Sequence, residues 1–317
     1  MRVVAVVVAY NRQDLLTGTL DALAAQTRPL DAVLVVDNAS TDQSAELARA
    51  HPVVTEVLSL DHNTGGAGGF CAGIAHSLMT LDAGAGAMWL MDDDTAPTPT
   101  ALEQLLAAWQ QHSGKLALAS SRVVWTDGRP HPMNSQRHRL FTSRRERAAA
   151  RRAGAFPIRT ASFVSVLVDG HAAWKHRLPR ADYFIWNDDL EYTARLLRHA
   201  QGIAVPSSVT VHHTKAFAGS FQDPGERFYY EVRNKLWTFF QSPAFGPLDN
   251  TIYLLYTVLG WGRAIVRSKN RGILWRGLCR GLRHGLFRRP RPNPQVLAGQ
   301  GQVSAEVLAI ERRAARL

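Results

Sequence analysis

Short apolar runs alternate with helical patterns along the first half of the chain. Residues 3–9 are an unbroken run of valine and alanine, and residues 32–36 form a second run of the same kind. Such runs are typical of strands that are buried on both faces of a parallel sheet. Between them, Leu16, Leu20 and Leu23 recur at helical spacing. Strand, helix and strand in this order predict an α/β fold with right-handed crossovers.

The pattern becomes less regular toward the C-terminus. Further strands are predicted at 53–60, 116–119, 122–125, 162–168, 203–205 and 209–211. Helices are predicted up to residue 50 and at 69–81, 99–112, 190–199, 223–240 and 270–288. Residues 127–152 have poor periodicity and much arginine, which favours a surface loop, and the last residues are expected to form a loose tail.

Three adjacent carboxylates, Asp92, Asp93 and Asp94, follow a short apolar run. Like charges this close raise one another's pKa, and the usual compensator is a divalent cation with oxygen ligands. If the strand continues, Asp92 and Asp94 point to one side and Asp93 to the other. The triplet by itself leaves two interpretations open, which are a metal site and a solvated acidic turn before the next helix.

Polar residues follow the first two predicted strands, where an open α/β sheet binds its ligand. Residues 10–12 are Tyr-Asn-Arg, and residues 37–38 are Asp-Asn. A glycine-rich segment at 63–70 comes next, and such a segment lets backbone approach a ligand or simply connects two elements flexibly. It is neither a dinucleotide fingerprint, which would follow the first strand directly, nor a P-loop, which would end in Lys-Ser/Thr.

A second acidic cluster, Asp188, Asp189 and Glu191, lies at the start of a predicted helix. The helix dipole stabilises carboxylates there, so N-capping is one interpretation. Capping needs a single carboxylate, however, and a general base at a helix start would be rigidly held, which favours catalysis. His212 and His213 end a predicted strand, and a histidine there is a metal ligand, a proton carrier or a packed imidazole.

The charge of the chain is strongly positive and unevenly distributed. The 317 residues carry a formal net charge of +11, and no Asp or Glu occurs from 250 to 305. Cys71 and Cys279 are too few and too distant for a disulfide framework, which indicates a reducing compartment. The apolar N-terminus lacks a small-residue cleavage site, so we interpret it as a first strand and not as a signal peptide.

The basic C-terminal part suggests contact with an anionic membrane surface. In the helix predicted at 270–288, five aliphatic residues fall on one face and three arginines elsewhere: Ile273, Leu274, Leu278, Leu282, Leu286, and Arg276, Arg280, Arg283. This pattern is typical of a helix that lies on anionic lipid, although a basic helix packed on its own domain has the same pattern. Residues 252–266 are too short a run to span a bilayer. The strong aliphatic face and the lack of a docking motif argue against nucleic acid.

Taken in order, the motifs resemble those of family 2 glycosyltransferases of the GT-A fold. The matching segments are residues 9–12, 35–42, 63–66 and 92–94, and the details at 63–70, 89–94 and 184–189 resemble the galactofuranosyltransferase and rhamnosyltransferase branch. The likeness covers roughly residues 3–240. It implies a Rossmann-like, mostly parallel sheet flanked by helices at 1–240, with a nucleotide half at 1–125 and an acceptor half at 160–240. A basic helical extension at 241–317 would follow.

The resemblance also implies roles for residues on the donor side. Asp37 would bind the base and ribose of a nucleotide sugar, with Tyr10 and Arg12 lining the same pocket. Asn63 and Gly66 would close over the nucleotide.

For the cation and the acceptor, the resemblance implies a further set of roles. Asp92 and Asp94 would hold Mn²⁺ or Mg²⁺ on the diphosphate, with His212 completing the shell and Asp93 near the ribose or donor sugar. Asp189 would be the general base and Asp188 would orient the acceptor. The family frequently has Trp-Asp-Asp or Gly-Asp-Glu there, whereas this chain has Asn-Asp-Asp, so the choice between the two carboxylates stays open.

The implied function is that of an inverting, metal-dependent glycosyltransferase. Its donor would be a UDP- or dTDP-sugar, and the details of the glycine-rich segment favour UDP-galactofuranose over the alternative, dTDP-rhamnose. Its acceptor would be a polyprenyl-diphosphate-linked glycan of the cell envelope. The expected location is cytoplasmic, peripherally on the inner face of the cell membrane, and the oligomeric state is left open. A nucleotidyltransferase is the alternative enzyme class, but it would carry a glycine-rich, basic loop directly after the first strand.

Overall fold

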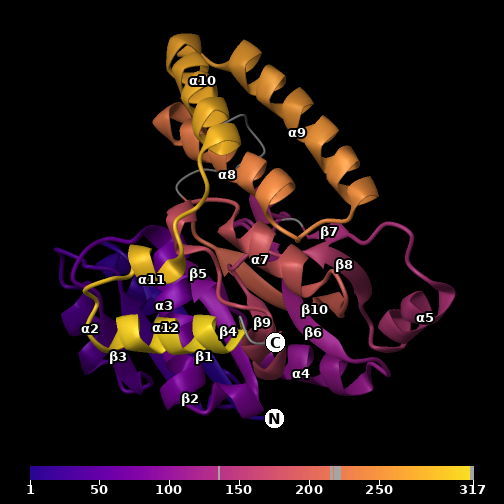
Figure 1. The fold of residues 1–317 in the computed structure, drawn as a ribbon. Helices are drawn as coiled ribbons and strands as arrows, with labels where there is room; N and C mark the ends of the chain where they lie inside the picture. The colour runs from indigo at the N-terminus through magenta and orange to yellow at the C-terminus, as the bar shows by residue number, and fades with distance from the viewer. Residues whose placement is uncertain (135, 215–216, 218–222, 315–317) are drawn as a thin grey trace.

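The computed structural model describes residues 1–134, 136–214, 217 and 223–314. Within them, ten strands form one mixed sheet in the order β3-β2-β1-β4-β9-β6-β10-β8-β7, and β5 pairs with β10. Helices cover the sheet, and α8, α9 and α10 project away from it (Figure 1). We call these three helices the helical arm. The predicted α/β class is therefore confirmed.

The strands have the following bounds: β1 Val3–Ala9, β2 Ala32–Asp37, β3 Glu56–Ser59, β4 Ala87–Asp92, β5 Thr95–Pro97, β6 Leu116–Val124, β7 Arg137–His138, β8 Phe156–Thr160, β9 Val166–Asp169 and β10 Gln201–His212. The α-helices are α1 Gln13–Ala24, α2 Ser44–Ala50, α3 Gly65–Thr80, α4 Ala101–Gln111, α5 Arg144–Arg152, α6 Gly170–Lys175, α7 Asp188–Leu196, α8 Phe228–Gln241, α9 Pro247–Arg267, α10 Arg271–Phe287, α11 Asn293–Val296 and α12 Gln302–Ala314.

Parallel pairing aligns the carboxyl ends of the first strands. Strand β1 lies between β2 and β4, with Ala9 opposite Asp37 and Val8 opposite Asp92. Strand β10 runs parallel to β6, and its last residue, His212, pairs with Thr95 of β5. The end of β10 therefore returns to the residues that directly follow β4. This register sets the position of the candidate site.

The unbroken apolar runs are covered on both faces, as predicted. Alternate residues of β1 pack into two separate cores, because successive side chains of a strand point to opposite faces. Val4, Val6 and Val8 join the core beneath α3, whereas Val3, Ala5 and Val7 join the core beneath α1 and α4.

Several predicted boundaries are wrong. The segments 203–205 and 209–211 belong to one strand, β10, with a register shift between them, and 116–119 and 122–125 both fall in β6 or at its end. The surface loop predicted at 127–152 contains helix α5, which Ser143 caps by accepting a hydrogen bond from the Glu146 N–H. A basic helix with a short apolar side gives too weak a periodicity to be recognised.

The glycine-rich segment is not a loop, because α3 begins at Gly65 and contains most of it. A Cβ on Gly69 would lie 2.5 Å from Val8, and one on Gly73 would lie 2.6 Å from Val6. These two glycines let the helix pack closely on β1. Gly66, in contrast, has open space where a side chain would be, and its backbone faces a cavity.

The loose tail predicted at the C-terminus is also wrong. Helix α12 packs on α3, and Val303, Val307 and Ile310 are buried in the core beneath that helix. His76 of α3, itself buried, lies 3.1 Å from the carboxylate of Glu306 on α12. The tail has an apolar stripe of only three residues, and it becomes stable through these contacts with α3.

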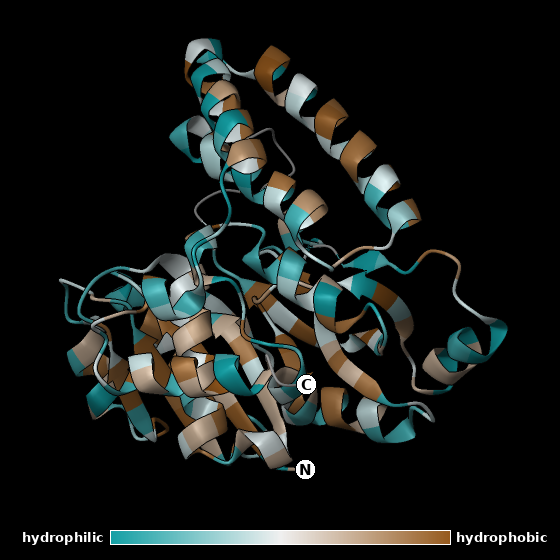
Figure 2. Cartoon of the chain, in the orientation of Figure 1, coloured by the Kyte–Doolittle hydropathy of each residue, from teal (hydrophilic) through white to brown (hydrophobic). Residues whose placement is uncertain are grey.

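Four of the five residues in the apolar stripe predicted to lie on a membrane face inward, and the fifth, Leu286, is exposed. Leu274 is fully buried, and Ile273, Leu278 and Leu282 pack against α8, so α10 is a basic helix packed on its own domain. Apolar side chains are instead exposed mainly on α9, where Leu255, Tyr256, Val258, Leu259 and Val266 are all at least half exposed (Figure 2). In the described part of the chain, no helix combines the length and the apolar character that crossing a bilayer requires.

Candidate active site

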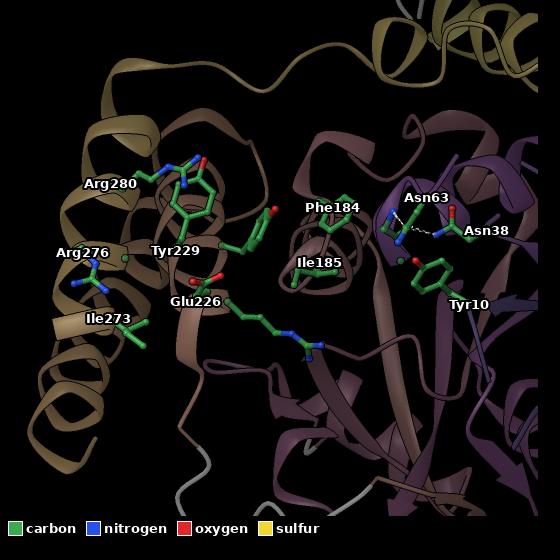
Figure 3. A pocket seen from close by; sticks show the side chains of 15 residues that line it. Tyr10, Asn38, Asn63, Phe184, Ile185, Glu226, Tyr229, Ile273, Arg276 and Arg280 are labelled. Atoms are coloured by element: carbon green, nitrogen blue, oxygen red, sulfur yellow. Dashed lines mark hydrogen bonds between the residues drawn. The ribbon is translucent and has the colours of Figure 1, made fainter. Parts of the chain in front are cut away.

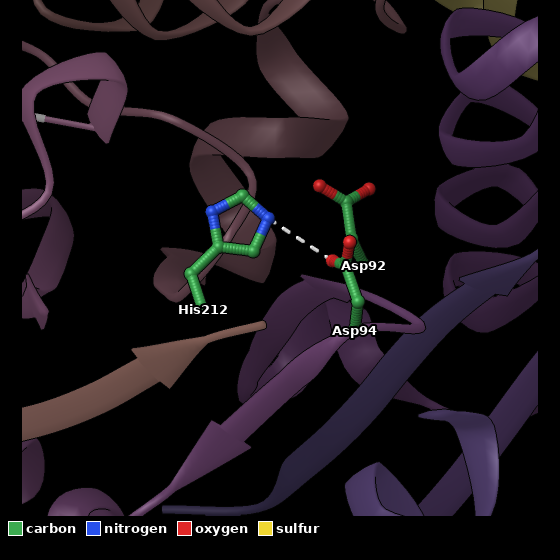
Figure 4. Close-up of side chains that lie close together, drawn as sticks. All are labelled: Asp92, Asp94 and His212. Carbon is green, nitrogen blue, oxygen red and sulfur yellow. Dashed lines mark ion pairs between the residues drawn. The ribbon is translucent and has the colours of Figure 1, made fainter. Parts of the chain in front are cut away.

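Two aspartates and a histidine form a compact group at the carboxyl end of β4. Ligand atoms of Asp92, Asp94 and His212 all lie within 4.8 Å of one another (Figure 4). The Asp94 carboxylate is 3.0 Å from Nε2 of His212 and 3.4 Å from the Arg12 guanidinium. Asp93 points elsewhere, because its carboxylate accepts a hydrogen bond from the Tyr10 N–H at 2.9 Å.

The ring of His212 is held in one orientation. Its Nδ1 lies 2.8 Å from the side-chain oxygen Oδ1 of Asn134, and the side-chain Nδ2 of Asn134 donates a hydrogen bond to Ser162. With Nδ1 as the donor, the Nε2 lone pair points at the two aspartates, and such an outer hydrogen bond is usual for metal-binding histidines. The neighbouring His213 lies outside the group and contributes its backbone N–H to the Asp94 carbonyl.

The electrostatics of this group favour a bound cation. Burial and then the neighbouring Asp94 raise the pKa of Asp92 well above its ordinary value, and burial raises the pKa of Asp93 to about 7. Burial also opposes ionisation of Asp94, but His212 and Arg12 lower its pKa overall. Two carboxylates and one imidazole nitrogen are a donor set that suits Mn²⁺ and is compatible with Mg²⁺.

The residues predicted to surround a nucleotide meet beside this group. Asn38 ties the end of β2 to the start of α3, because its amide donates to Gly65 and its carbonyl accepts from Thr64. Tyr10, Asn63 and Gly66 line one cavity there (Figure 3), whereas Asp37 is buried and accepts a hydrogen bond from the Ser40 N–H.

Two members of the second acidic cluster, Asp188 and Asp189, line a cavity of about 770 Å³ together with Asp92 and His212. Burial and the adjacent Asp189 raise the pKa of Asp188 to about 8. Burial also raises the pKa of Asp189, but the Leu190 N–H, Lys235 and Arg137 act in the opposite direction. The two carboxylates therefore differ in their surroundings, and Asp189 is the one that faces cationic groups.

Glu191, the third member of that cluster, has a structural role. It is fully buried and forms an ion pair with Arg195 at 2.8 Å, while Ser242 donates a hydrogen bond to it. The hypothesis of three functional carboxylates at this helix start therefore reduces to two.

The turn before α7 has a strained backbone. Phe184, Trp186 and Asn187 have φ values of 65°, 64° and 68°, a region that side chains other than glycine rarely adopt. Asn234 of α8, itself fully buried, holds this turn. Its side-chain amide nitrogen lies 2.8–3.0 Å from three carbonyl oxygens, those of Tyr183, Ile185 and Trp186.

Sequence reasoning assigned no role to the residues of α8 that act at this site. Glu231 accepts a hydrogen bond from the Asn187 amide at 2.7 Å. Lys235 lines the same 770 Å³ cavity as Asp188 and Asp189, and 7% of its surface is exposed. Glu231, Asn234 and Lys235 recur at the spacing of one helix face. In the sequence, the visible signal is a polar face on an aromatic helix, but this pattern does not distinguish an amide that holds a turn from one that faces solvent.

Comparisons with known proteins agree with this geometry. A family model described as glycosyl transferase family 2 matches residues 4–171. The galactofuranosyltransferase GlfT1 of Mycobacterium tuberculosis is 31% identical over 290 residues, which cover 86% of this chain and 92% of that protein. GlfT1 of Mycolicibacterium smegmatis is 43% identical over 112 residues, which cover 35% of this chain and 36% of that protein.

Solved structures share the fold at low sequence identity. TarS of S. aureus, residues 1–349 in complex with UDP, has a TM-score of 0.61 at 15% identity, with coverage of 100% of this chain and 92% of that one. A mannosyltransferase from Pyrobaculum calidifontis in complex with GDP-Man and Mn²⁺ has a TM-score of 0.51 at 17% identity, with coverage of 99% and 87%.

We predict that His212 and His213 differ in their effect on cation binding. His212→Gln should weaken Mn²⁺ binding at least about tenfold, because it removes the imidazole that faces both aspartates. His213→Gln is the matched control and should leave the affinity unchanged. Titration of each variant with Mn²⁺ by calorimetry measures the difference, and equal losses in both would contradict the assignment.

We also predict that Asn234→Ala disorders the strained turn. It should lower the free energy of unfolding by about 1–3 kcal/mol and turnover by about ten- to a hundredfold, because the adjacent Asp188 and Asp189 lose their position. Asn250→Ala is the control, since its amide also donates to a backbone carbonyl, that of Phe239 at 2.7 Å, but away from the turn. Denaturant unfolding and steady-state kinetics should show stability loss in both variants and turnover loss in the first. Full turnover in Asn234→Ala would refute the role.

Proposed function

Because the chain belongs to glycosyltransferase family 2, we propose that it is an inverting, metal-dependent enzyme that transfers galactofuranose from UDP-galactofuranose to a lipid-linked glycan acceptor. One observation carries the proposal. Asp92 and His212 line the same cavity as Asp188 and Asp189, and ligand atoms of Asp92, His212 and Asp94 lie within 4.8 Å of one another. A site for the leaving diphosphate and a site for an acceptor base are thus combined in one space.

On the donor side, Asp92, Asp94 and His212 would hold Mn²⁺ or Mg²⁺, and the cation would neutralise charge on the departing diphosphate. Tyr10, Arg12, Asp37, Asn63 and Gly66 surround the nucleotide. Asp93 acts through the backbone, since it fixes the N–H of Tyr10 at the end of β1 and so positions the residue that lines the nucleotide cavity.

On the acceptor side, Asp189 is the general base. Lys235 and Arg137 favour its ionised form, whereas the raised pKa of Asp188, about 8, keeps that group protonated and able to donate a hydrogen bond to the acceptor. Asp189 takes the proton of an acceptor hydroxyl, whose oxygen bonds to the anomeric carbon as the bond to the nucleoside diphosphate breaks. A single displacement of this kind inverts the anomeric centre.

The choice of donor is supported by the relatives. The full-length similarity is to proteins named galactofuranosyltransferases, which favours UDP-galactofuranose over dTDP-rhamnose. A polyprenyl-diphosphate-linked acceptor and a location on the inner face of the cell membrane remain part of the proposal. The exposed apolar side chains of α9 and the arginines of α10 support both. We propose a catalytic domain at 1–240 and a basic helical region at 241–317, of which α9 and α10 face the membrane while α12 packs on α3.

A donor screen tests this function. With Mn²⁺ and a lipid-linked acceptor present, we expect release of UDP from UDP-galactofuranose to exceed release of dTDP from dTDP-rhamnose at least about tenfold. The reverse order would assign the rhamnosyl function. Release of pyrophosphate in place of a nucleoside diphosphate would indicate a nucleotidyltransferase.

Substitution of the two candidate bases separates their roles. Asp189→Asn should lower turnover at least about a hundredfold, because an amide cannot accept the proton. Binding of UDP and Mn²⁺ should stay unchanged, since the donor groups are intact. Asp188→Asn retains a neutral hydrogen-bonding group and should lose about tenfold or less. A greater loss in Asp188→Asn would exchange the two assignments.

A further inference from the structure

We call the 770 Å³ cavity lined by Asp188 and Asp189 the catalytic cavity. Beside it lies a second cavity, of about 690 Å³, which is the one that Tyr10, Asn63 and Gly66 line and that the nucleotide would enter. Gly66, Ile185 and Arg227 line both. One wall of the second cavity is the nucleotide edge of the sheet, with Tyr10 and Asn63. The other wall is the helical arm (Figure 3). A molecule bound between these walls would extend past the shared residues into the catalytic cavity, which Asp189 lines.

The wall that the arm provides is cationic. Arg227, Arg276 and Arg280 line the cavity, and Glu226 is the single carboxylate among its lining residues. Among the described residues, the side chains of Arg227 and Arg276 have neither a hydrogen-bond partner nor an ion-pair partner, and Arg280 stacks on the Tyr229 ring at 4.6 Å. Guanidinium groups free of protein carboxylates bind anions that offer several oxygens, phosphate esters above all.

The floor of the cavity is aromatic. Phe184, from the strained turn, stacks on Tyr230 of α8 with ring centroids 5.6 Å apart, so this pair joins the two walls. Tyr229 lies next to it. Aromatic faces beside cationic groups suit a ligand that is apolar or saccharide on either side of an anionic centre.

We propose that Arg227, Arg276 and Arg280 form a subsite for the diphosphate ester of the lipid-linked acceptor. This inference rests on the proposed function. The donor diphosphate has its own partner in the Asp92, Asp94 and His212 group, whereas the arginines lie on the opposite wall. The arm also exposes apolar residues outside the cavity, including Trp275 of α10 and Leu259 of α9, where an isoprenoid chain can continue into a membrane.

The test compares two double variants of equal charge. Arg276→Gln with Arg280→Gln removes the subsite from α10, whereas Arg267→Gln on α9 with Arg283→Gln on α10 removes two charges at residues that line neither cavity. Arg227 is left intact because it borders the catalytic cavity. The probe is farnesyl diphosphate, titrated by calorimetry into full-length protein that is saturated with UDP and Mn²⁺.

We expect the first double variant to bind farnesyl diphosphate at least about tenfold more weakly than wild type, and the control to bind it equally well. UDP affinity should be unchanged in both. The proposal is overturned if UDP with Mn²⁺ displaces the probe, since the arginines would then bind the diphosphate of the donor. It is equally overturned if the two double variants lose the same affinity, or if wild type does not bind the probe.

This outcome is independent of the donor screen. If the wild-type protein releases UDP from UDP-galactofuranose normally but does not bind farnesyl diphosphate, this inference alone is refuted. Binding of the probe as expected, without any nucleoside diphosphate release, would refute the proposed function and leave a diphosphate site on a different enzyme.

Discussion

Repulsion among buried carboxylates is the constraint on which the site depends. Asp92, Asp94, Asp188 and Asp189 line or border one cavity, and burial opposes ionisation of all of them. A fold keeps such a cluster only if the surrounding groups compensate for it. Arg12 and His212 act on Asp94, and Lys235 and Arg137 act on Asp189. The remaining imbalance is centred on Asp92, where a cation would relieve it.

Compensation comes from distant parts of the chain, so the site cannot form from the nucleotide half alone. His212 arrives at the end of the long strand β10, and Lys235 belongs to the helical arm. The arm also holds the strained turn through Asn234, and that turn directly precedes the two candidate bases. The arm therefore helps to build the candidate site as well as extending from the sheet.

Residues at strand ends could be predicted from the sequence, and residues that depend on tertiary partners could not. The topology rule for α/β sheets brings Tyr10, Asp37 and Asp92 together once the strands are recognised, because their side chains directly follow apolar runs. Asn234 lies within an aromatic helix, and nothing local distinguishes an amide that holds a turn from one that faces solvent. The apolar residues of α10 recur at the spacing of one helix face, so the helix itself could be predicted. The sequence left two candidate partners for that face, lipid and α8, and the packing of Leu274 against α8 in the folded chain decides between them.

The inward orientation of that stripe changes how the positive charge of the C-terminal part is used. With Leu274 and Leu278 packed on α8, Arg276 and Arg280 turn toward the cavity beside the nucleotide edge. Under the proposed function, two diphosphates require two different partners. Carboxylates with a cation suit the donor, but without a second cation they would repel an acceptor diphosphate. Guanidinium groups on a separate wall avoid that repulsion, because they keep the acceptor's charge away from Asp188 and Asp189 while its glycan reaches them.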